Sequence, residues 1–136
     1  MQTIFPSPEW MLTLHEKLNS DTRYAEIAKR WEGDLCILIE PSGALKERCI
    51  LYLDLWHGTC RKAEIISQMD GVKPAFLLTA SFENITKILT GRLDPMQAMM
   101  TRKLHVQGNM AVMMRSVPTV LDFVRCCKEC TTEILS

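Results

Sequence analysis

Residues 81–115 read SFENITKILTGRLDPMQAMMTRKLHVQGNMAVMMR, and the organisation of the whole chain follows from this stretch. Ser81 is a suitable N-cap for a helix, and Gly91 suits the left-handed residue that ends one. The apolar residues between them recur at helical spacing and predict one buried face: Phe82, Ile85, Ile88 and Leu89. The stretch therefore begins with a short amphipathic helix.

A second helix, a strand and a third helix are predicted to follow. Asp94 can cap the second helix, with Pro95 at its first position, where a missing N–H costs nothing. Residues 104–107 alternate as a short strand, and Gly108-Asn109 turns the chain into the third helix. Six of the nine methionines lie on these two helices: Met96, Met99, Met100, Met110, Met113 and Met114.

The methionines allow two interpretations. Methionine is an unbranched, polarizable side chain that fills irregular gaps, so a methionine-rich stripe is often ordinary core. The same adaptability suits a cavity wall that must accept flexible alkyl chains, because each side chain can change rotamer without leaving a fixed void. Both interpretations stay open at the level of sequence.

The run of Gly91, Asp94-Pro95, Ala98, the apolar pair Met99-Met100, Lys103-Leu104, Val106 and Gly108-Asn109 resembles the C-terminal half of the sterol carrier protein 2 family. This resemblance implies a lipid-binding fold in which a five-stranded sheet, in the order 3-2-1-4-5, and covering helices enclose an apolar tunnel. It implies ligands such as fatty acyl chains, sterols or related lipids. Upstream, the chain matches the family only in pattern.

The middle of the chain is predicted to be β. Strands are expected over residues 35–40, 48–56, 59–67 and 75–80, and the third of these carries charges that suit an edge strand. His57-Gly58 is expected to make a tight turn. With the strand at 104–107, the pattern predicts an α+β fold, with a mixed sheet covered mainly on one face and one domain over residues 1–136.

Helices are expected at both ends. The first begins after Ser7, and a second carries apolar residues up to Trp31, with Gly33 as its stop. They are either buttresses packed on the sheet or a gate over a cavity. Pro118 predicts a kink or a fresh start in the tail, which then continues as an amphipathic helix through Thr131 and Ile134. That helix is structural core, a mobile closure of the tunnel or a dimer contact.

Composition narrows the function. Sixteen basic and sixteen acidic residues leave no net charge, so the sequence gives little support to nucleic-acid binding or to electrostatic attraction to an anionic membrane. The first residues lack the pattern of a signal peptide and the last are not Ser-Lys-Leu, so a cytoplasmic protein is expected. The expected partners are a lipid or fatty acyl ligand and a transient membrane contact, and the expected state is a monomer or homodimer.

The side chains capable of chemistry are few. Cys126, Cys127 and Cys130 form a C-C-x-x-C cluster that suits a metal or redox site, but no second pair completes a zinc site. The histidines are scattered, and no hydrolase, Walker or dinucleotide-binding motif occurs. We therefore expect no enzyme activity, no cofactor and no metal.

The sequence predicts a non-enzymatic lipid-binding or lipid-transfer protein, holding a fatty acyl, sterol-like or isoprenoid ligand. Two alternatives stay open, an interaction or regulatory module with a filled core and a cysteine-cluster metal or redox protein. Thr101 stands where a family member places a glutamine near its ligand, and Arg102 or Lys103 is either a head-group ligand or solvated surface charge. The predicted ligand-binding residues are Phe82, Ile85, Ile88, Leu89, Met96, Met99, Met100, Thr101, Leu104, Val106, Met110, Met113 and Met114.

Overall fold

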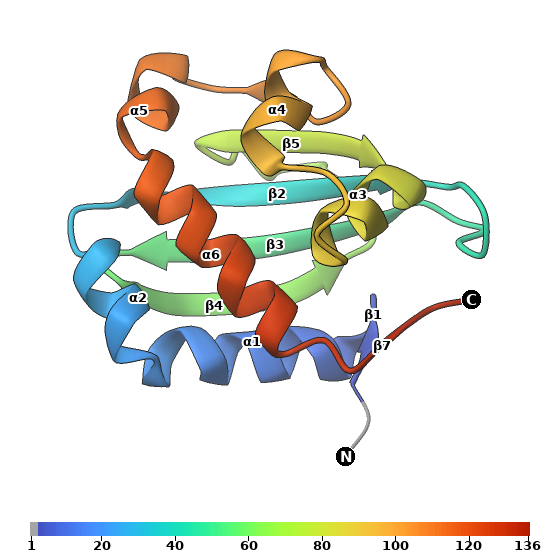
Figure 1. The fold of residues 1–136 in the computed structure, drawn as a ribbon, viewed down its shortest axis with the longest axis horizontal. Helices are drawn as coiled ribbons and strands as arrows, with labels where there is room; N and C mark the ends of the chain where they lie inside the picture. Colours follow the sequence, from blue (N-terminus) through green and yellow to red (C-terminus); the bar gives the residue numbers. More distant parts are fainter. Residues whose placement is uncertain (1–2) are drawn as a thin grey trace.

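The computed structural model of the protein describes residues 3–136. Its elements follow one another along the chain as β1 (Ile4–Phe5), α1 (Pro8–Ser20), α2 (Thr22–Ile27), β2 (Glu32–Glu40), β3 (Cys49–Trp56), β4 (Thr59–Ile66), β5 (Phe76–Ser81), α3 (Phe82–Leu89), α4 (Pro95–Met100), β6 (His105–Gln107), α5 (Met110–Arg115), α6 (Val117–Glu129) and β7 (Glu133–Ile134). Figure 1 shows α6 crossing one face of the sheet.

Five strands form a mixed sheet in the order β4-β3-β2-β5-β6. Numbered among themselves, these strands have the order 3-2-1-4-5 that the family resemblance implies. β2 pairs parallel with β5, and the other three pairings are antiparallel. β4 is an edge strand, as its charges predicted. The α+β fold class is confirmed.

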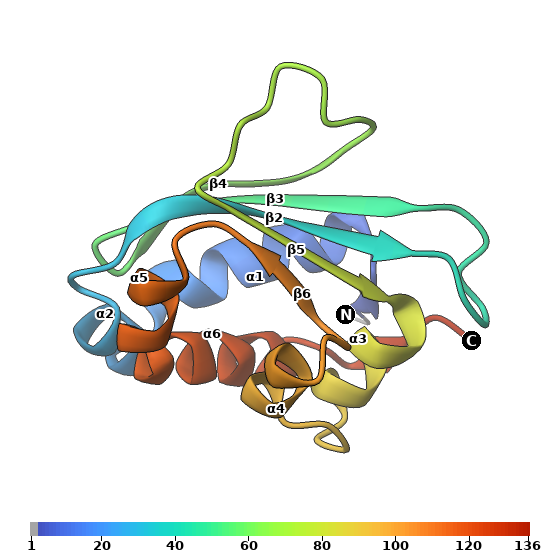
Figure 2. The same ribbon diagram turned by 90° about the horizontal axis from the view of Figure 1, so that it is seen from above.

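The helices lie on one face of the sheet, and the loop between β4 and β5 rises from the other (Figure 2). Alternation along the strands separates the two faces, because successive side chains point to opposite sides. The main core lies under the helices and includes Leu35, Leu51 and Leu53. A smaller cluster around Cys36 and Ile50 lies on the opposite face.

The helix starts predicted from sequence are confirmed. The side chains of Ser81, Asp94 and Asn109 accept hydrogen bonds from backbone N–H groups three residues on, at the starts of α3, α4 and α5. Gly91 has φ +79° and follows the last turn of α3. There Gly91 N–H donates to Ile88 O and Arg92 N–H to Lys87 O, at 3.2 and 2.8 Å, which is the Schellman arrangement.

The prediction for α2 was wrong at its end. The helix stops at Ile27, and Gly33 lies inside β2 instead of ending the helix. Gly33 has φ +148°, and a Cβ there would lie 3.2 Å from Cβ of Ala75. Glycine therefore lets the backbone at position 33 and the segment at Ala75 come close together at the start of the sheet.

The prediction for the tail was right at its start and wrong at its end. α5 ends at Arg115 and α6 starts afresh with Pro118 in its first turn. α6 ends at Glu129, so Thr131 and Ile134 are not helical. Instead β7 pairs parallel with β1, and Leu135 N–H donates to Phe5 O at 3.0 Å. The partner of this segment is the other end of the chain, which local periodicity does not reveal.

Candidate functional site

A first cavity of about 90 Å³ lies between the sheet and the helices, and only apolar surface faces it. It is lined by Phe5, Trp10, Ile37, Leu51, Leu78, Ile85, Ile88, Leu89, Pro95, Met99, Leu104, Val120, Phe123, Val124 and Cys127. None of the described residues that line the cavity is charged. Such a lining favours apolar over polar contents, because the burial of apolar surface is favourable roughly in proportion to its area.

The lining is produced by the periodicity of each element. Ile37, Leu51 and Leu78 point from β2, β3 and β5 toward the helices, because they hold alternate positions on paired strands. Ile85, Ile88 and Leu89 share one face of α3 at helical spacing. α6 faces them across the cavity with Val120, Phe123, Val124 and Cys127.

The N-terminal segment closes one side of the cavity. Phe5 and Trp10 pack edge to face with ring centroids 4.7 Å apart. Trp10 Nε1–H donates to Thr131 Oγ1 at 2.8 Å, which satisfies the indole and ties α1 to the residues after α6. At the other end of α1, Asn19 Nδ2–H donates to Cys60 O and Cys60 N–H donates to Asn19 Oδ1. These bonds fix α1 as a buttress across β4.

A second, smaller cavity of about 40 Å³ adjoins the first. Leu78, Met99, Val120 and Phe123 line both cavities. Met113 of α5 and Tyr24 of α2 face the second cavity alone. The interior therefore holds two apolar spaces with a common wall of side chains.

Comparison with known proteins shows which family has this sequence pattern. The model of the SCP-2 sterol transfer family matches residues 13–120, which include the sheet and most of the cavity lining. The chain belongs to the SCP-2 sterol transfer family. No curated protein matches the chain in a direct comparison.

Solved structures of the SCP-2 fold agree with this assignment. A crystal structure of sterol carrier protein 2 has 28% identity and a TM-score of 0.81, covering 90% of this chain and 96% of that chain. The solution structure of a Thermus thermophilus protein, described as a possible sterol carrier protein, has 26% identity and a TM-score of 0.82, covering 92% and 88%. A sec-alkylsulfatase from Pseudomonas shares the fold alone, at 15% identity and a TM-score of 0.56, covering 88% of this chain but 16% of the enzyme.

Some of the predicted SCP-2 ligand residues face the cavities and others do not. Ile85, Ile88, Leu89, Met99 and Leu104 line the first cavity, and Met99 and Met113 line the second. Phe82 is buried in the main core outside both cavities, and Val106 packs against that core. Met96 is half-buried and lines neither cavity. A role in ligand binding stays a prediction for all of the residues in this paragraph.

The remaining predicted residues lie at the surface. Met100 is 80% exposed, Met110 and Met114 are also exposed, and none of the three lines either cavity. Thr101, Arg102 and Lys103 are exposed as well. Helix periodicity explains the difference, because Met99 and Met100 are about 100° apart around α4 and cannot both face inward. The prediction from methionine spacing therefore assigned too much of the surface of each helix to the protein interior.

Several lining residues were missed by treating residues 81–115 as the whole site. The strand residues Ile37, Leu51 and Leu78 and the terminal residues Phe5 and Trp10 come from elsewhere in the chain. In the sequence, alternation over residues 48–56 predicts one face with Leu51, Leu53 and Leu55. The predicted apolar face of the tail helix comprises Val120, Leu121, Val124, Cys127, Thr131 and Ile134, and of these Leu121 is exposed. Periodicity thus indicated burial at these positions, but it does not distinguish a cavity wall from filled core.

A polar cluster fastens α6 to the first two helices. Arg125 donates to Asp122 through Nε and Nη2 at 2.8 and 3.0 Å, and to Asp21 through Nη2 and Nη1 at 2.8 and 3.2 Å. Its Nη1 also donates to Glu129, which accepts from Lys17. The hydrogen bonds from Arg125, followed by those from the backbone N–H of Tyr24 and from Lys17, lower the pKa of Asp21 well below its ordinary value.

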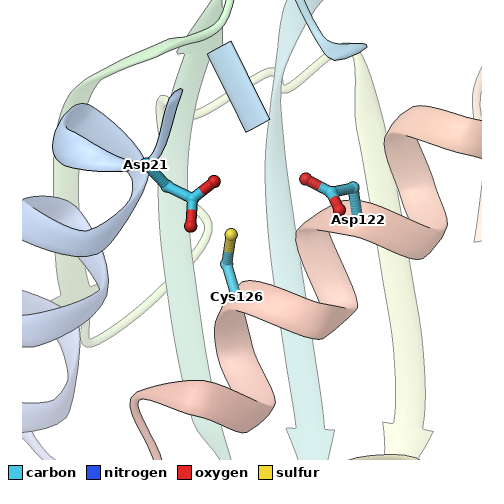
Figure 3. A group of neighbouring side chains, drawn as sticks. All are labelled: Asp21, Asp122 and Cys126. Atoms are coloured by element: carbon cyan, nitrogen blue, oxygen red, sulfur yellow. The ribbon is translucent and has the colours of Figure 1, made fainter. Parts of the chain in front are cut away.

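Asp21, Asp122 and Cys126 form a group of side chains with spacing suited to a metal ion, because one ligand atom from each lies within 4.8 Å of the others. Figure 3 shows the Cys126 sulfur directed toward the space between the two carboxylates. Arg125 already occupies both carboxylates, and a cation there would have to displace its guanidinium. The residues therefore fit an internal ion pair better than a metal centre.

The three clustered cysteines are buried thiols with raised pKa values. Burial raises the pKa of Cys126 and Cys130 to about 11 and that of Cys127 well above its ordinary value. Because the thiolate is both the nucleophile and the metal ligand, these environments disfavour metal binding and fast redox chemistry. Cys127 instead contributes its side chain to the wall of the first cavity.

Proposed function

We propose that this protein, as one domain over residues 1–136, binds an apolar lipid chain in the first cavity and transfers it between membranes or lipid aggregates without altering it chemically. The observation that carries the proposal is a cavity bounded by strands and helices whose lining is wholly apolar. Membership of the SCP-2 sterol transfer family supports the same function. Fatty acyl, sterol-like and isoprenoid chains are the ligands of suitable chemistry.

Burial of the chain supplies the free energy of binding. At about 0.8 kcal/mol per methylene, a chain of ~16 carbons offers on the order of 12 kcal/mol before association and ordering costs. A micromolar dissociation constant requires only about 8 kcal/mol net. Because no charged side chain lines the cavity, the polar head of the ligand stays outside, and selectivity among chains is loose.

The size of the cavity means that binding requires movement of side chains. Pockets for small molecules commonly have volumes of roughly 300–1,000 Å³, which exceeds both spaces together. Met99 stands between the two spaces, and its unbranched side chain can change rotamer at low cost. Ligand entry would join the two cavities by displacing Met99.

The small volume also favours a second candidate, an interaction module whose core is nearly filled. In that case the protein binds no lipid, and its partners contact its surface. The absence of enzyme activity and a location in the cytoplasm stay part of the proposal. None of the helices in residues 3–136 is both long and apolar enough to cross a membrane.

The first test is native mass spectrometry of freshly purified protein, with organic extraction of any bound lipid. A fluorescent fatty acid then measures binding to the wild type, to Met99→Trp and to Met100→Trp. Met99→Trp fills the space between the cavities and should abolish binding, whereas Met100→Trp places the same ring at an exposed neighbouring position and should retain it. An apo mass together with no probe binding at tens of micromolar would overturn lipid binding and favour the interaction module.

A further inference from the structure

The short helices α4 and α5 are apolar on two sides, although only one side of each faces the interior. Met99 and Met113 both line the second cavity. The next residue along each helix points outward, so Met100 is 80% exposed and Met114 is 52% exposed. Met110, at the start of α5, is exposed as well. Both helices lie along the β6 edge of the sheet, at the top of Figure 1 and toward the viewer in Figure 2.

The same edge carries unbalanced positive charge. Residues 91–121 include the basic residues Arg92, Arg102, Lys103 and Arg115 but a single acidic residue, Asp94, although the whole chain is neutral. All five charged side chains are exposed. Within the described part of the chain, the four basic residues take part in no ion pair, unlike Arg125 and Arg61.

Arg102 also occupies an unusual backbone conformation. It follows the end of α4 with φ +61°, the left-handed region that glycine adopts freely and an arginine adopts at a cost. Its N–H donates to Met99 O at 3.3 Å, in the position that terminates the helix. The chain thus has a long cationic side chain two residues after exposed Met100, at a point where a glycine would be less strained.

We propose that this methionine edge, formed by Met100, Met110, Met114, Arg102, Lys103 and Arg115, is the surface through which the protein docks on a bilayer containing anionic phospholipids. Flexible apolar side chains enter the boundary between head groups and acyl chains, and arginine and lysine side chains pair with lipid phosphates. The inference deepens the proposed function. Because the opposite sides of α4 and α5 line the cavities, docking here would bring the cavity wall against the membrane.

Charge complementarity distinguishes this edge from another exposed apolar side chain on a helix surface, Leu12. Leu12 of α1 is 61% exposed, but Glu9 and Glu16 lie three residues before it and four after it on the same face. Those carboxylates would be repelled by an anionic membrane. Leu12 therefore provides a control position of similar exposure and unfavourable charge.

Sedimentation with vesicles tests the inference directly. We expect binding to vesicles of phosphatidylglycerol and phosphatidylcholine that exceeds binding to phosphatidylcholine alone and weakens as salt concentration rises. Arg102→Asn combined with Lys103→Ser should weaken binding by at least tenfold, since each charge near an anionic surface contributes roughly fivefold. Asparagine tolerates the left-handed conformation at position 102. Met100→Glu combined with Met114→Glu should weaken binding similarly, and Leu12→Glu should leave it unchanged.

Lipid-probe binding in solution, without vesicles, separates this inference from the proposed function. The charge variant should retain binding of the fluorescent fatty acid and the wild-type thermal unfolding curve, because Arg102 and Lys103 line neither cavity. Vesicle binding by a wild type that takes no fatty acid would support the docking surface and overturn the proposed function. Wild-type protein that ignores anionic vesicles at low salt, or variants that bind them as the wild type does, would overturn the docking surface.

Discussion

Met99 of α4 and Phe123 of α6 both line the first and the second cavity, so the two side chains form part of the wall that divides the apolar interior. One belongs to a six-residue helix at the β6 edge, and the other to the thirteen-residue helix that crosses the sheet. The usable length of the cavity depends on these side chains. Their rotamers determine whether the interior is two small spaces or one longer space.

Phe123→Ala should join the two cavities permanently. We expect the preferred fatty acid to become longer in a displacement series from about 12 to 20 carbons, because each added methylene finds space worth about 0.8 kcal/mol. The free energy of unfolding should fall by about 3 kcal/mol through the loss of buried contacts. Leu121→Ala, at an exposed position of the same helix, should change either quantity little. An unchanged chain-length preference in Phe123→Ala would contradict this account of the dividing wall.

The Asp21–Arg125 ion pair should make stability depend on pH in the acid range. The pKa of Asp21 is lowered from 3.8, chiefly by hydrogen bonds from Arg125. A carboxyl with a depressed folded-state pKa stabilises the protein above its unfolded value and loses that contribution as pH falls through the folded value. Wild-type stability should therefore decline below about pH 4, as measured by urea unfolding.

Asp21→Asn isolates this contribution, because asparagine keeps the N-cap of α2 and removes the charge. The variant should be less stable by about 1–3 kcal/mol at pH 7, and its deficit should shrink toward pH 2. Asp94→Asn is the matched control, since Asp94 also caps a helix but is exposed and has no ion pair among the described residues. An equal deficit at pH 7 and pH 2 would rule out the charged interaction as the cause.

Removal of the hydroxyl group should have opposite effects on the free energy of unfolding at Tyr24 and at Tyr52. Among residues 3–136 the buried Tyr24 hydroxyl has no hydrogen-bond partner, whereas the Tyr52 hydroxyl donates to Asp34 Oδ2 at 2.8 Å. Removing an unsatisfied buried group avoids a desolvation cost, so Tyr24→Phe should raise the free energy of unfolding by about 1 kcal/mol. Tyr52→Phe should lower it by about 1 kcal/mol or more, because Asp34 loses a donor. Chemical denaturation of both variants gives the sign, and destabilisation by Tyr24→Phe would reveal a partner for that hydroxyl.

The cysteines should behave as buried thiols. Burial raises the pKa of Cys126 and Cys130 to about 11, so a thiol reagent at pH 7.5 should modify the cluster slowly in native protein. All six cysteines should react at once in denaturant, and metal analysis of the purified protein should find no stoichiometric zinc or iron. Rapid native labelling at Cys126, identified by peptide mass spectrometry, would restore a redox role. The half-buried Cys49 provides an internal comparison for the rate of thiol modification in the native protein.

Most of the fold could be predicted because its determinants are local. Ser81, Asp94 and Asn109 cap helices through bonds that span three residues, and strand alternation placed Leu51 and Leu53 on one face. Such signals survive in a single sequence because they do not depend on distant partners. The strand order, by contrast, came from the resemblance of residues 91–109 to a known family.

The errors occurred where a distant partner decides the outcome. Ile134 pairs with Phe5 instead of continuing the helix that its periodicity predicted, and Gly33 lies close to Ala75, which directly precedes β5. The methionine edge was not recognised from the sequence, because composition reports only a sum over the whole chain. Neutral composition obscured the basic residues of the methionine edge, because the residues outside 91–121 include 15 acidic but only 12 basic side chains and offset the local excess.

The sequence by itself determined the helices and strands, their buried faces and the family of the fold, since each depends on short-range periodicity, capping and motif spacing. Only the tertiary structure decided which apolar residues surround empty space. Met99 and Met100 are chemically identical neighbours, yet one lines both cavities and the other is 80% exposed. Their difference arises from the packing of α4 against α6 and the sheet. Neither the chemistry of methionine nor the local sequence specifies which distant residues each side chain will face.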